Sequence, residues 1–404
     1  MIDFTALQAV LNTVIMPAVK DQMYEKAPSW QLVGGWSAAK QVATRANVGV
    51  DKFENNKMYI SIRDGYHSGI VNIQPGQKYQ YGQPQWDQTY NQIKTLVGSF
   101  IIPKAVLNTS DKGAVIRPLM NNSRSLANDM AMESNRQLYT KGDGVIATAA
   151  SASGGTSTTL YLTPSVNGDI VYSRYFPKGL VIAVGASGPM TVASATGNTV
   201  TLASPGGTWS ANDPINRVNG SNVNCDSLDG FPEMVSASIT YQNLSVAAAP
   251  LWASSEDAAI ETLTGSTIQS KMFSQYFLAN QTGSVNWILA NRHAFQCYGE
   301  SLTGQVRFDP KEVLTGGWVG LDFMAGQAKI LLDFDCNDDN IYFMTMDEVI
   351  FGEFQPLEWE KGTDGMLFKI QQQLDYEVTA SWMGNVGTTV RSAHSKLHNK
   401  TFTI

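Results

Sequence analysis

Charged residues are scarce in this chain of 404 residues, since Asp, Glu, Lys and Arg make up only 16% of it. The formal net charge of −7 argues against a protein whose whole surface binds nucleic acid. The charges are also unevenly placed: residues 1–142 carry 15 Lys and Arg against 10 Asp and Glu, whereas residues 143–404 carry 13 against 25. A mildly basic N-terminal third is compatible with one face near a polyanion, although an ordinary solvated surface has the same composition.

Cysteine and catalytic signatures are nearly absent. The three cysteines, Cys225, Cys297 and Cys336, are odd in number and lack CxxC spacing, which is typical of a reducing compartment and not of a disulfide framework or a zinc site. No Gly-Lys dipeptide occurs, so a Walker A loop in its usual form is excluded. Neither a GxSxG elbow nor an HExxH helix is present. The sequence therefore predicts no cofactor, no metal site and no catalytic residue, and we do not expect an enzyme.

The N-terminal apolar stretch at residues 4–19 is too short and too polar to span a bilayer. It is interrupted by Gln8, Asn12 and Thr13, and no basic segment precedes it. This pattern argues against a signal peptide and a membrane anchor. It favours an amphipathic arm helix that ends near Pro17.

The densest group of carboxylates lies in DFDCNDDN, at residues 333–340, which begins like a calcium loop. The sixth position is Asp338 where Gly is required, and the twelfth is Met344 where Glu is required, so the motif fails. We predict a solvated turn between strands. None of the four histidines lies in a recognisable constellation, and the last two, His394 and His398, belong to a polar tail.

A long hairpin is predicted over residues 55–95. KMYISIR, at residues 57–63, alternates as a half-buried strand should, and GIVNI, at residues 69–73, is expected to run back as a second strand. The following residues 74–86 have no helical period and carry several aromatic side chains. A projecting two-stranded ribbon cannot stabilise itself in water, so it needs a partner surface, and no neighbouring segment supplies one.

The longest helical pattern runs from about residue 111 to residue 141. Apolar residues recur there at intervals of three and four, which predicts one face on a core and one in water. Gly142, Asp143 and Gly144 supply a turn that ends the helix. A run of this length is well above the usual three to four turns, so we expect the helix to lie along an extended structure.

The rest of the chain alternates between strand-rich and mixed segments. Residues 152–226 are nearly free of charge and dense in short strand patterns, which predicts a small all-β domain. A helix is expected over residues 256–282, followed by a buried strand in VNWILA and a further helix from residue 291. Residues 366–394 alternate over a long extent, which predicts long antiparallel strands near the end of the chain.

Three stretches carry a resemblance to the major capsid proteins of tailed bacteriophages with the HK97 fold. They are KMYISIR with QYGQPQW for the extended loop, RSLANDMAMESNRQLYTKGDG for the spine helix, and VNWILANRHAFQCYGESL for the axial domain. The likeness lies in the order of the elements. It implies an α+β fold with an N-terminal arm (1–54), an extended loop (55–95), a peripheral domain with the spine helix (96–151 and 350–404), an inserted small all-β domain (152–226) and an axial domain (227–349).

The resemblance also implies a function. The chain would be a late virion protein that assembles in the host cytoplasm into hexamers and pentamers, which close into an icosahedral shell around double-stranded DNA. The implied partners are other copies of the chain, a separate scaffolding protein, a portal, DNA held by non-specific lumenal contacts and, as an option, a decoration protein; no membrane is expected. The candidate inter-subunit contact residues are Lys78, Tyr79, Tyr81, Trp86, Arg117, Arg124 and Arg136. Packing within their own subunit is the alternative for the aromatic residues.

Other readings remain open at the sequence level. An encapsulin-type compartment shares the fold but holds enzymes instead of DNA. A glycan hydrolase would need paired carboxylates in a cleft, whereas the adjacent pairs Glu256/Asp257 and Asp347/Glu348 are expected to point in different directions. A tail or fibre protein fits the helix and the axial unit less well. A covalent link between Lys78 and Asn385 or Asn399 would need a buried carboxylate as base, and no residue can be assigned that role.

Overall fold

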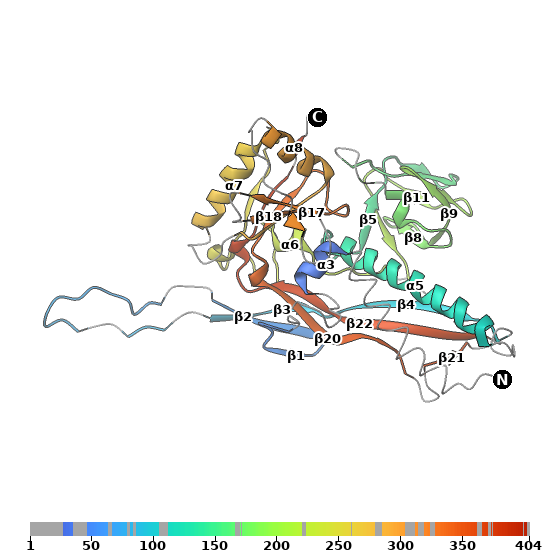
Figure 1. The fold of residues 1–404 in the computed structure, drawn as a ribbon, viewed down its shortest axis with the longest axis horizontal. Helices are drawn as coiled ribbons and strands as arrows, with labels where there is room; N and C mark the ends of the chain where they lie inside the picture. Colours follow the sequence, from blue (N-terminus) through green and yellow to red (C-terminus); the bar gives the residue numbers. More distant parts are fainter. Residues whose placement is uncertain are drawn as a thin grey trace. The chain divides into compact units, whose positions relative to one another are not determined.

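The computed structural model of the chain is α+β and rich in strands, as the sequence predicts. It describes residues 27–34, 47–63, 67–78, 81–83, 86–104, 112–165, 170, 172–219, 224–259, 261–278, 285–303, 312–313, 319–323, 328–361, 366–370, 373, 375–398 and 400–401. The chain divides into two compact units, whose ribbons are drawn in Figure 1. Unit 1 comprises Met1–Ser61, Gln88–Arg136 and Val349–Thr389, and unit 2 comprises Ile62–Asp87, Gln137–Glu348 and Val390–Ile404.

A four-stranded sheet forms the framework of unit 1. Its central strand, β22 (Tyr376–Thr388), pairs antiparallel with β4 (Lys94–Ile102) on one side. On the other side it pairs antiparallel with β20 (Val349–Trp359) and with the short β21 (Phe368–Lys369). The prediction of long antiparallel strands over residues 366–394 is confirmed up to Thr388.

The long helix of unit 1, α5 (Lys112–Gln137), packs on one face of this sheet (Figure 1). A Cβ atom added to Gly98 of β4 would lie 2.7 Å from Leu126 Cδ1 and 2.8 Å from Met130 Sδ, so the absence of a side chain lets the helix approach closely. The predicted bounds were 111–141. The helix stops earlier because the backbone turns after Gln137, where Thr140 N bonds to the Gln137 carbonyl.

Three aromatic residues form the centre of unit 1. Trp30 lies on α3 (Pro28–Val33) and contacts Phe351 and Trp382 edge-on, with ring centroids 5.2 and 5.5 Å away. Trp30 is only 2% exposed, and its backbone N–H donates to the side-chain carbonyl of Asn135 on α5. The part of the predicted arm around Trp30 is therefore core, because its indole fills the space beneath the sheet. The predicted arm helix at residues 4–19 lies outside the described residues.

A three-stranded sheet in the order β1-β2-β3 lies at the base of the extended loop. Its strands are β1 (Lys52–Glu54), β2 (Lys57–Arg63) and β3 (Trp86–Gln92). The strand predicted at residues 57–63 is confirmed. The strand predicted at residues 69–73 is wrong for the single chain, since the described residues of the loop, 67–78 and 81–83, contain no strand. A strand is stable only beside a hydrogen-bonded partner, and this segment has none in the described part of the chain.

A seven-stranded mixed sheet organises the part of unit 2 predicted as the axial domain. Its order is β13 (Ser255–Asp257), β23 (Ser395–Leu397), β19 (Ile341–Met344), β15 (Trp287–Ala290), β18 (Ala328–Leu332), β17 (Val319–Phe323) and β16 (Glu312–Val313). The helices α7 (Gly265–Leu278) and α8 (Arg292–Thr303) contribute Ile268, Met272 and Ala294 to its core. The strand in VNWILA and the helix after it are thus confirmed.

Two expectations for this region need correction. The helix predicted over residues 256–282 begins only at Gly265, because the preceding residues form β13 and β14 (Glu261–Thr262). The last residues were assigned with 350–404 to the peripheral domain, but β23 pairs with β13 and β19, and β24 (Lys400–Thr401) pairs with β14. The end of the chain therefore belongs to unit 2.

Residues 145–217 form a six-stranded sheet with a core of its own. Its order is β5 (Val145–Thr148), β12 (Pro214–Arg217), β8 (Val181–Val184), β9 (Met190–Thr196), β10 (Thr199–Leu202) and β7 (Thr159–Tyr161), with the pair β6 (Ser153–Gly154) and β11 (Thr208–Trp209) beside it. Its core includes Leu160, Ile182, Val200 and Ile215, all fully or almost fully buried. The sheet begins at Val145 and not at the predicted residue 152, because β5 pairs with β12. Short helical segments complete unit 2: α6 (Phe231–Met234), η2 (Tyr172–Tyr175), η3 (Pro250–Trp252), η4 (Met346–Glu348) and η5 (Arg391–Ala393).

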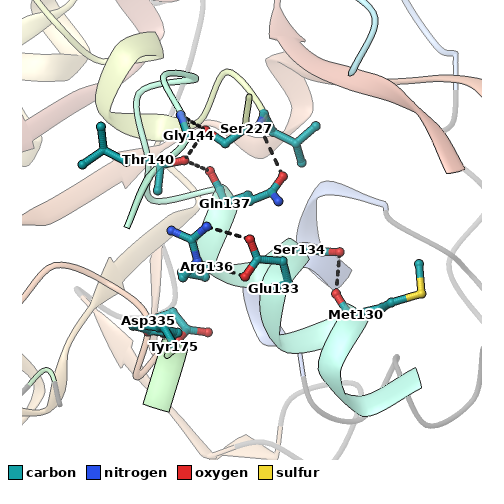
Figure 2. A network of polar contacts seen from close by, with 12 residues as sticks. Met130, Glu133, Ser134, Arg136, Gln137, Thr140, Gly144, Tyr175, Ser227 and Asp335 are labelled. Carbon is teal, nitrogen blue, oxygen red and sulfur yellow. Dashed lines mark hydrogen bonds and ion pairs between the residues drawn. The ribbon is translucent and has the colours of Figure 1, made fainter. Parts of the chain in front are cut away.

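The chain enters and leaves this six-stranded sheet at the same place (Figure 2). Gly144 N donates to Ser227 Oγ at 3.1 Å, and Ser227 Oγ also lies 3.0 Å from Thr140 Oγ1. Gly144 has a φ of 72°, and a Cβ atom there would lie 1.8 Å from the Cys225 carbonyl oxygen. Only glycine fits such a close backbone approach, which is the physical reason for the Gly-Asp-Gly turn that the sequence displays.

No helix among the described residues has both the length and the apolar character that crossing a membrane requires.

Candidate functional site

The extended loop between β2 and β3 exposes apolar side chains. Every residue from Ile70 to Lys78 is exposed. Ile70 is 81% exposed, Val71 46% and Ile73 49%. Three neighbouring branched aliphatic side chains in water forgo the roughly 1.5–3 kcal/mol that burial contributes for each. An exposed apolar patch on a long loop is a candidate interaction site.

The second limb of the loop carries two of the predicted contact residues. Tyr81 is 83% exposed, and Trp86, at the start of β3, is 61% exposed. A Cβ atom added to Gly69 would lie 2.7 Å from Gly82 N, so the two limbs approach through glycine backbone and no side-chain core forms between them at this point. For Tyr81 and Trp86, packing within their own subunit leaves most of the ring exposed. Tyr79 lies outside the described residues.

The base of the loop is anchored. Met58 and Ile60 of β2 are fully buried, and Thr89 Oγ1 of β3 donates to the Ile60 carbonyl at 3.0 Å. Asn91 Nδ2 donates to the carbonyl of Val386 on β22 at 2.7 Å. A firm base with an exposed end holds the loop's apolar residues in water without folding them onto a core.

Charge marks one end of the exposed stretch. Residues 68–77 contain no Asp, Glu, Lys or Arg, and Lys78 follows them as an exposed cation. An uncharged segment can be covered by a partner without the desolvation of an ion.

The three candidate arginines of α5 differ. Arg124 is exposed, as a contact residue must be. Arg136 is only 6% exposed, and its Nη2 lies 2.6 Å from Glu133 Oε1 in an ion pair within the same helix (Figure 2). Its expected availability to a neighbouring subunit is not found in the single chain, because the side chain is buried and Glu133 already compensates its charge. The side chain of Arg117 lies outside the described residues.

Sequence reasoning missed two sets of exposed apolar residues. It selected the aromatic residues of the loop and passed over Ile70, Val71 and Ile73, although the β-branched pattern of GIVNI could have drawn attention to them. It also missed Val97 and Ile101 of β4, which are 56% and 52% exposed. Both sets lie in sequences that predict strands, whose apolar residues are ordinarily assigned to a core.

The acidic loop between β18 and β19 is not the predicted solvated turn. Asp333 is 1% exposed and accepts a hydrogen bond of 3.1 Å from the Tyr139 hydroxyl. Asp335 accepts one of 2.7 Å from the Tyr175 hydroxyl, and Figure 2 draws these two side chains together. Asp335 also forms an ion pair with Arg174. Hydroxyl and guanidinium donors replace water, which is why Asp333 can be buried and Asp335 partly buried. Among the described residues no group of three or more His, Cys, Asp and Glu side chains could hold a metal ion.

The predicted polar tail is also buried. Arg391 is 0% exposed and donates to four backbone carbonyls, those of Glu233, Met234, Ser236 and Ile239. Burial lowers the pKa of Arg391 to about 10.

His394, near the same end of the chain, is 0% exposed, and its Nδ1 accepts from Thr345 N at 3.3 Å. Burial, and then the positive charge of Arg391, lower the pKa of His394 to about 3, so the imidazole is neutral in the folded chain.

The adjacent carboxylates considered for glycan hydrolysis have separate partners. Glu256 Oε1 lies 2.9 Å from Lys396 Nζ and 3.0 Å from His398 Nε2. Burial opposes ionisation of Glu256, but the hydrogen bond from Lys396 and further partners hold its pKa below the ordinary value. Asp257 lies 3.7 Å from Lys400 Nζ, and its pKa is lowered first by the backbone N–H of Ala259. This arrangement stabilises strand pairing and does not present two carboxylates to a substrate.

The residues considered for a covalent link are not prepared for it. Asn385 is 0% exposed, its Nδ2 donates to the Gln92 carbonyl at 2.7 Å, and its Oδ1 accepts from Val386 N. Lys78 is exposed on the loop. Asn399 lies outside the described residues.

The comparisons with known proteins concern the fold. No protein-family model and no curated protein matches the chain. Among solved structures, the capsid asymmetric unit of cyanophage A-1(L) is 12% identical over 93% of each chain, with a TM-score of 0.49. The capsid of the native GTA particle is 10% identical over 90% of this chain and 93% of that one, with a TM-score of 0.43. An encapsulin of Synechococcus elongatus PCC 7942 is 9% identical over 93% of this chain and 97% of its own, with a TM-score of 0.42. The three solved structures are two capsids and an encapsulin.

Proposed function

We propose that this chain is the major capsid protein of a tailed bacteriophage. Many copies would form hexameric and pentameric rings that close into an icosahedral shell around double-stranded DNA. The shell would assemble in the host cytoplasm and become the virion capsid, with a separate scaffolding protein and a portal as partners during assembly. Its function would be self-assembly into this shell, with no catalytic step.

One observation carries the proposal: the extended loop displays Ile70, Val71 and Ile73 in water on an anchored base. A chain that worked as a monomer would gain by replacing these side chains with polar ones, because they form no core with the described residues of the loop. A chain that works as one of many copies uses them to bind its neighbour. Tyr81 and Trp86 add large amphipathic side chains to the same surface, as is typical of interfaces.

Weak contacts of this kind suffice for a shell. Each copy binds several neighbours at once, so modest affinity at one loop is multiplied through effective concentration. The exposed Arg124 of α5 provides a cationic group for a neighbouring subunit or for packaged DNA. The sheet formed by residues 145–217 would be an outer module, since it has its own core and needs no neighbour to fold.

Electron microscopy of the purified full chain tests the proposal. We expect closed shells or ring-shaped capsomers in negative stain, and a light-scattering mass of many copies. Nuclease-protected double-stranded DNA inside the shells would support a capsid, whereas shells that retain a folded cargo protein and no DNA would support an encapsulin-type compartment. A chain that stays a monodisperse monomer at high concentration, with or without DNA and a scaffolding protein, would contradict both.

A further inference from the structure

The six-stranded sheet and the seven-stranded sheet of unit 2 have separate apolar cores. The core of the six-stranded sheet takes all of its buried residues from 146–215, and the core of the seven-stranded sheet takes its own from 263–397. The two cores have no residue in common among the described residues, so neither needs the other to bury its apolar side chains. The structure joins the two sheets by a neck of paired backbone and by a latch of polar side chains.

The neck consists of residues 140–145 and 224–229, where the chain enters and leaves the six-stranded sheet. Gly144 N donates to Ser227 Oγ at 3.1 Å across it. Gly142 and Gly144 have φ values of 77° and 72°, so the backbone turns sharply on the entering side. A body that is attached through one such connection can pivot about it, because a few backbone dihedrals absorb the motion.

The half of the latch that belongs to the six-stranded sheet is the short helix η2. It packs on β5 and β9, and its last residue, Tyr175, belongs to the core of that sheet and is 7% exposed. Burial, and then the negative charges of Asp338 and Asp339, raise the pKa of Tyr172 to about 12. Since these carboxylates lie between β18 and β19, η2 is fixed to one sheet and faces a loop of the other.

The other half of the latch is the acidic loop, residues 333–339, which is fixed to the seven-stranded sheet. Asp333 N donates to the Ala290 carbonyl at 3.0 Å, at the end of β15. Asn291 Nδ2 donates to the Cys336 carbonyl at 2.6 Å, and Cys336 is 0% exposed. Each half of the latch is therefore mounted on its own sheet.

The latch closes between Arg174, Tyr175 and Asp335. The Tyr175 hydroxyl donates to Asp335 Oδ1 at 2.7 Å (Figure 2), and Arg174 forms an ion pair with the same carboxylate. Arg174 Nη2 also donates to the Phe334 carbonyl at 3.2 Å. The side chains of Arg174 and Asp335 are 34% and 13% exposed, so water lies close enough to replace these partners. Polar contacts of this kind are weak in net terms and open more readily than an apolar core.

We propose that the six-stranded sheet is a hinged module that Arg174, Tyr175 and Asp335 hold against the seven-stranded sheet. When this latch breaks, the module pivots on the neck while both sheets stay folded. Docking then depends on one carboxylate, so a change of charge at Asp335 is enough to release the whole module. The proposal concerns the single chain and does not depend on the proposed function.

Hydrogen exchange of the full chain, measured by mass spectrometry below the concentration at which it assembles, tests the latch. Asp335→Arg places a second guanidinium against Arg174, so the amides of η2 and of the acidic loop should exchange about ten-fold faster or more. The amides of β8 and β15, inside the two cores, should stay within about two-fold of wild type. Asp347→Arg is the matched control, because it makes the same substitution at an exposed position of η4.

A charge swap separates a broken latch from local damage to the loop. The double variant Arg174→Asp/Asp335→Arg restores opposite charges, and its exchange in both latch segments should return to within about three-fold of wild type. Arg174→Gln opens the latch from the other side and should speed the same two segments, which keeps the test valid if Asp335→Arg does not fold.

Small-angle scattering of the same unassembled samples shows whether the module moves. The radius of gyration should rise in Asp335→Arg and Arg174→Gln and return to the wild-type value in the charge swap. Unchanged protection of η2 and the acidic loop in both single variants would overturn the proposal, as would a charge swap without rescue. Loss of protection in β8 together with η2 would show unfolding of the sheet in place of its release, and would also overturn it.

Discussion

The loop at residues 69–78 is apolar and exposed, whereas the C-terminal segment at residues 391–400 is rich in charge and largely buried. The loop has aliphatic residues and a single charge, and Ile70 is 81% exposed. The C-terminal segment has an arginine, two histidines and two lysines, yet Arg391 and Lys400 are 0% exposed. A hydropathy argument would place the first inside and the second outside.

Partners explain the reversal. The polar groups of the C-terminal segment find theirs within the chain: carbonyl oxygens for Arg391, Glu256 for Lys396, and the Ala259 carbonyl for Lys400. Buried polar groups are stable when hydrogen-bonded. In the described part of the loop, Ile70, Val71 and Ile73 meet no apolar surface that buries them, so these side chains lie in water. Exposure of apolar residues on the loop supports the proposed association, whereas burial of charge at the C-terminus stabilises the fold of the single chain.

The largest expected effect comes from making the loop polar. The double variant Ile70→Lys/Ile73→Lys should abolish assembly, because two ammonium groups would have to be desolvated at each contact. Its unfolding free energy should change by less than about 0.5 kcal/mol, since both positions are exposed in the single chain. Electron microscopy and urea unfolding measure the two quantities.

The matched control for this variant is Thr191→Lys/Thr201→Lys, on exposed positions of β9 and β10. It adds the same charge and should assemble normally. A loop variant that still forms shells, or a control that fails equally, would contradict the assignment of the loop as the contact surface.

Removing the guanidinium of Arg391 should have the next largest effect, on folding. Arg391→Met removes the donor of four backbone carbonyls, two of them in buried hydrogen bonds, so we expect a loss of about 3 kcal/mol in unfolding free energy. Urea unfolding in the Ile70→Lys/Ile73→Lys background avoids the contribution of assembly to stability. Lys178→Met, at an exposed position, should cost almost nothing; equal losses in the two variants would refute the inferred role of Arg391.

Acid should weaken the same region through His394. Its pKa is about 3 in the folded chain and near 6.5 when unfolded, so the unfolded chain binds one more proton between these values. This contribution is complete above pH 6.5 and is lost at up to about 1.4 kcal/mol per pH unit as the pH falls towards 3. His394→Asn keeps an acceptor near Thr345 N and does not titrate.

The difference in pH dependence between wild type and His394→Asn isolates the histidine, because the carboxylates contribute equally to both. Parallel stability curves between pH 7 and pH 4, measured in the assembly-deficient background, would count against a buried neutral His394.

The smallest effect is expected from deleting the six-stranded sheet. Gly144 and Cys225 are in backbone contact, so joining Gly144 directly to Asp226 should leave the seven-stranded sheet folded. The cost should be about 1–3 kcal/mol, from the lost donors of Asp335. Deleting residues 152–226 should cost more unfolding free energy, because β5 would remain in the chain without its partner strand β12. Circular dichroism and thermal unfolding compare the two variants. An unfolded product from the deletion of residues 145–225 would show that the sheet is not an independent module.

Sequence patterns predicted the elements whose periodicity is local. The strand at residues 57–63, the long helix around Met130 and the strand in VNWILA were predictable, because alternation and helical spacing report directly on which face is buried. The Gly-Asp-Gly turn was predictable as a helix end. The requirement for glycine at position 144 was not predictable, because it comes from the close approach of the Cys225 backbone, which is a contact between distant segments.

Part of the candidate site was predictable too. The projecting loop and its exposed Tyr81 and Trp86 follow from a segment without helical period and without a neighbouring partner. The burial of Arg136 beside Glu133 was not predictable, since periodicity gives the direction of a side chain but not what covers it. The same limit applies to Asp333 and His394, whose burial depends on donors far away in the sequence.

By itself, the sequence determined the α+β composition, the positions of most helices and strands, and the lack of any local motif for catalysis, because each of these depends on residues close together in the chain. The tertiary structure alone decided that β23 joins the seven-stranded sheet and β24 pairs with β14, that the charged C-terminal segment is buried, and that β4 is left as an apolar edge. These depend on long-range pairing, where a strand or an ion is stabilised by whichever partner the fold brings to it.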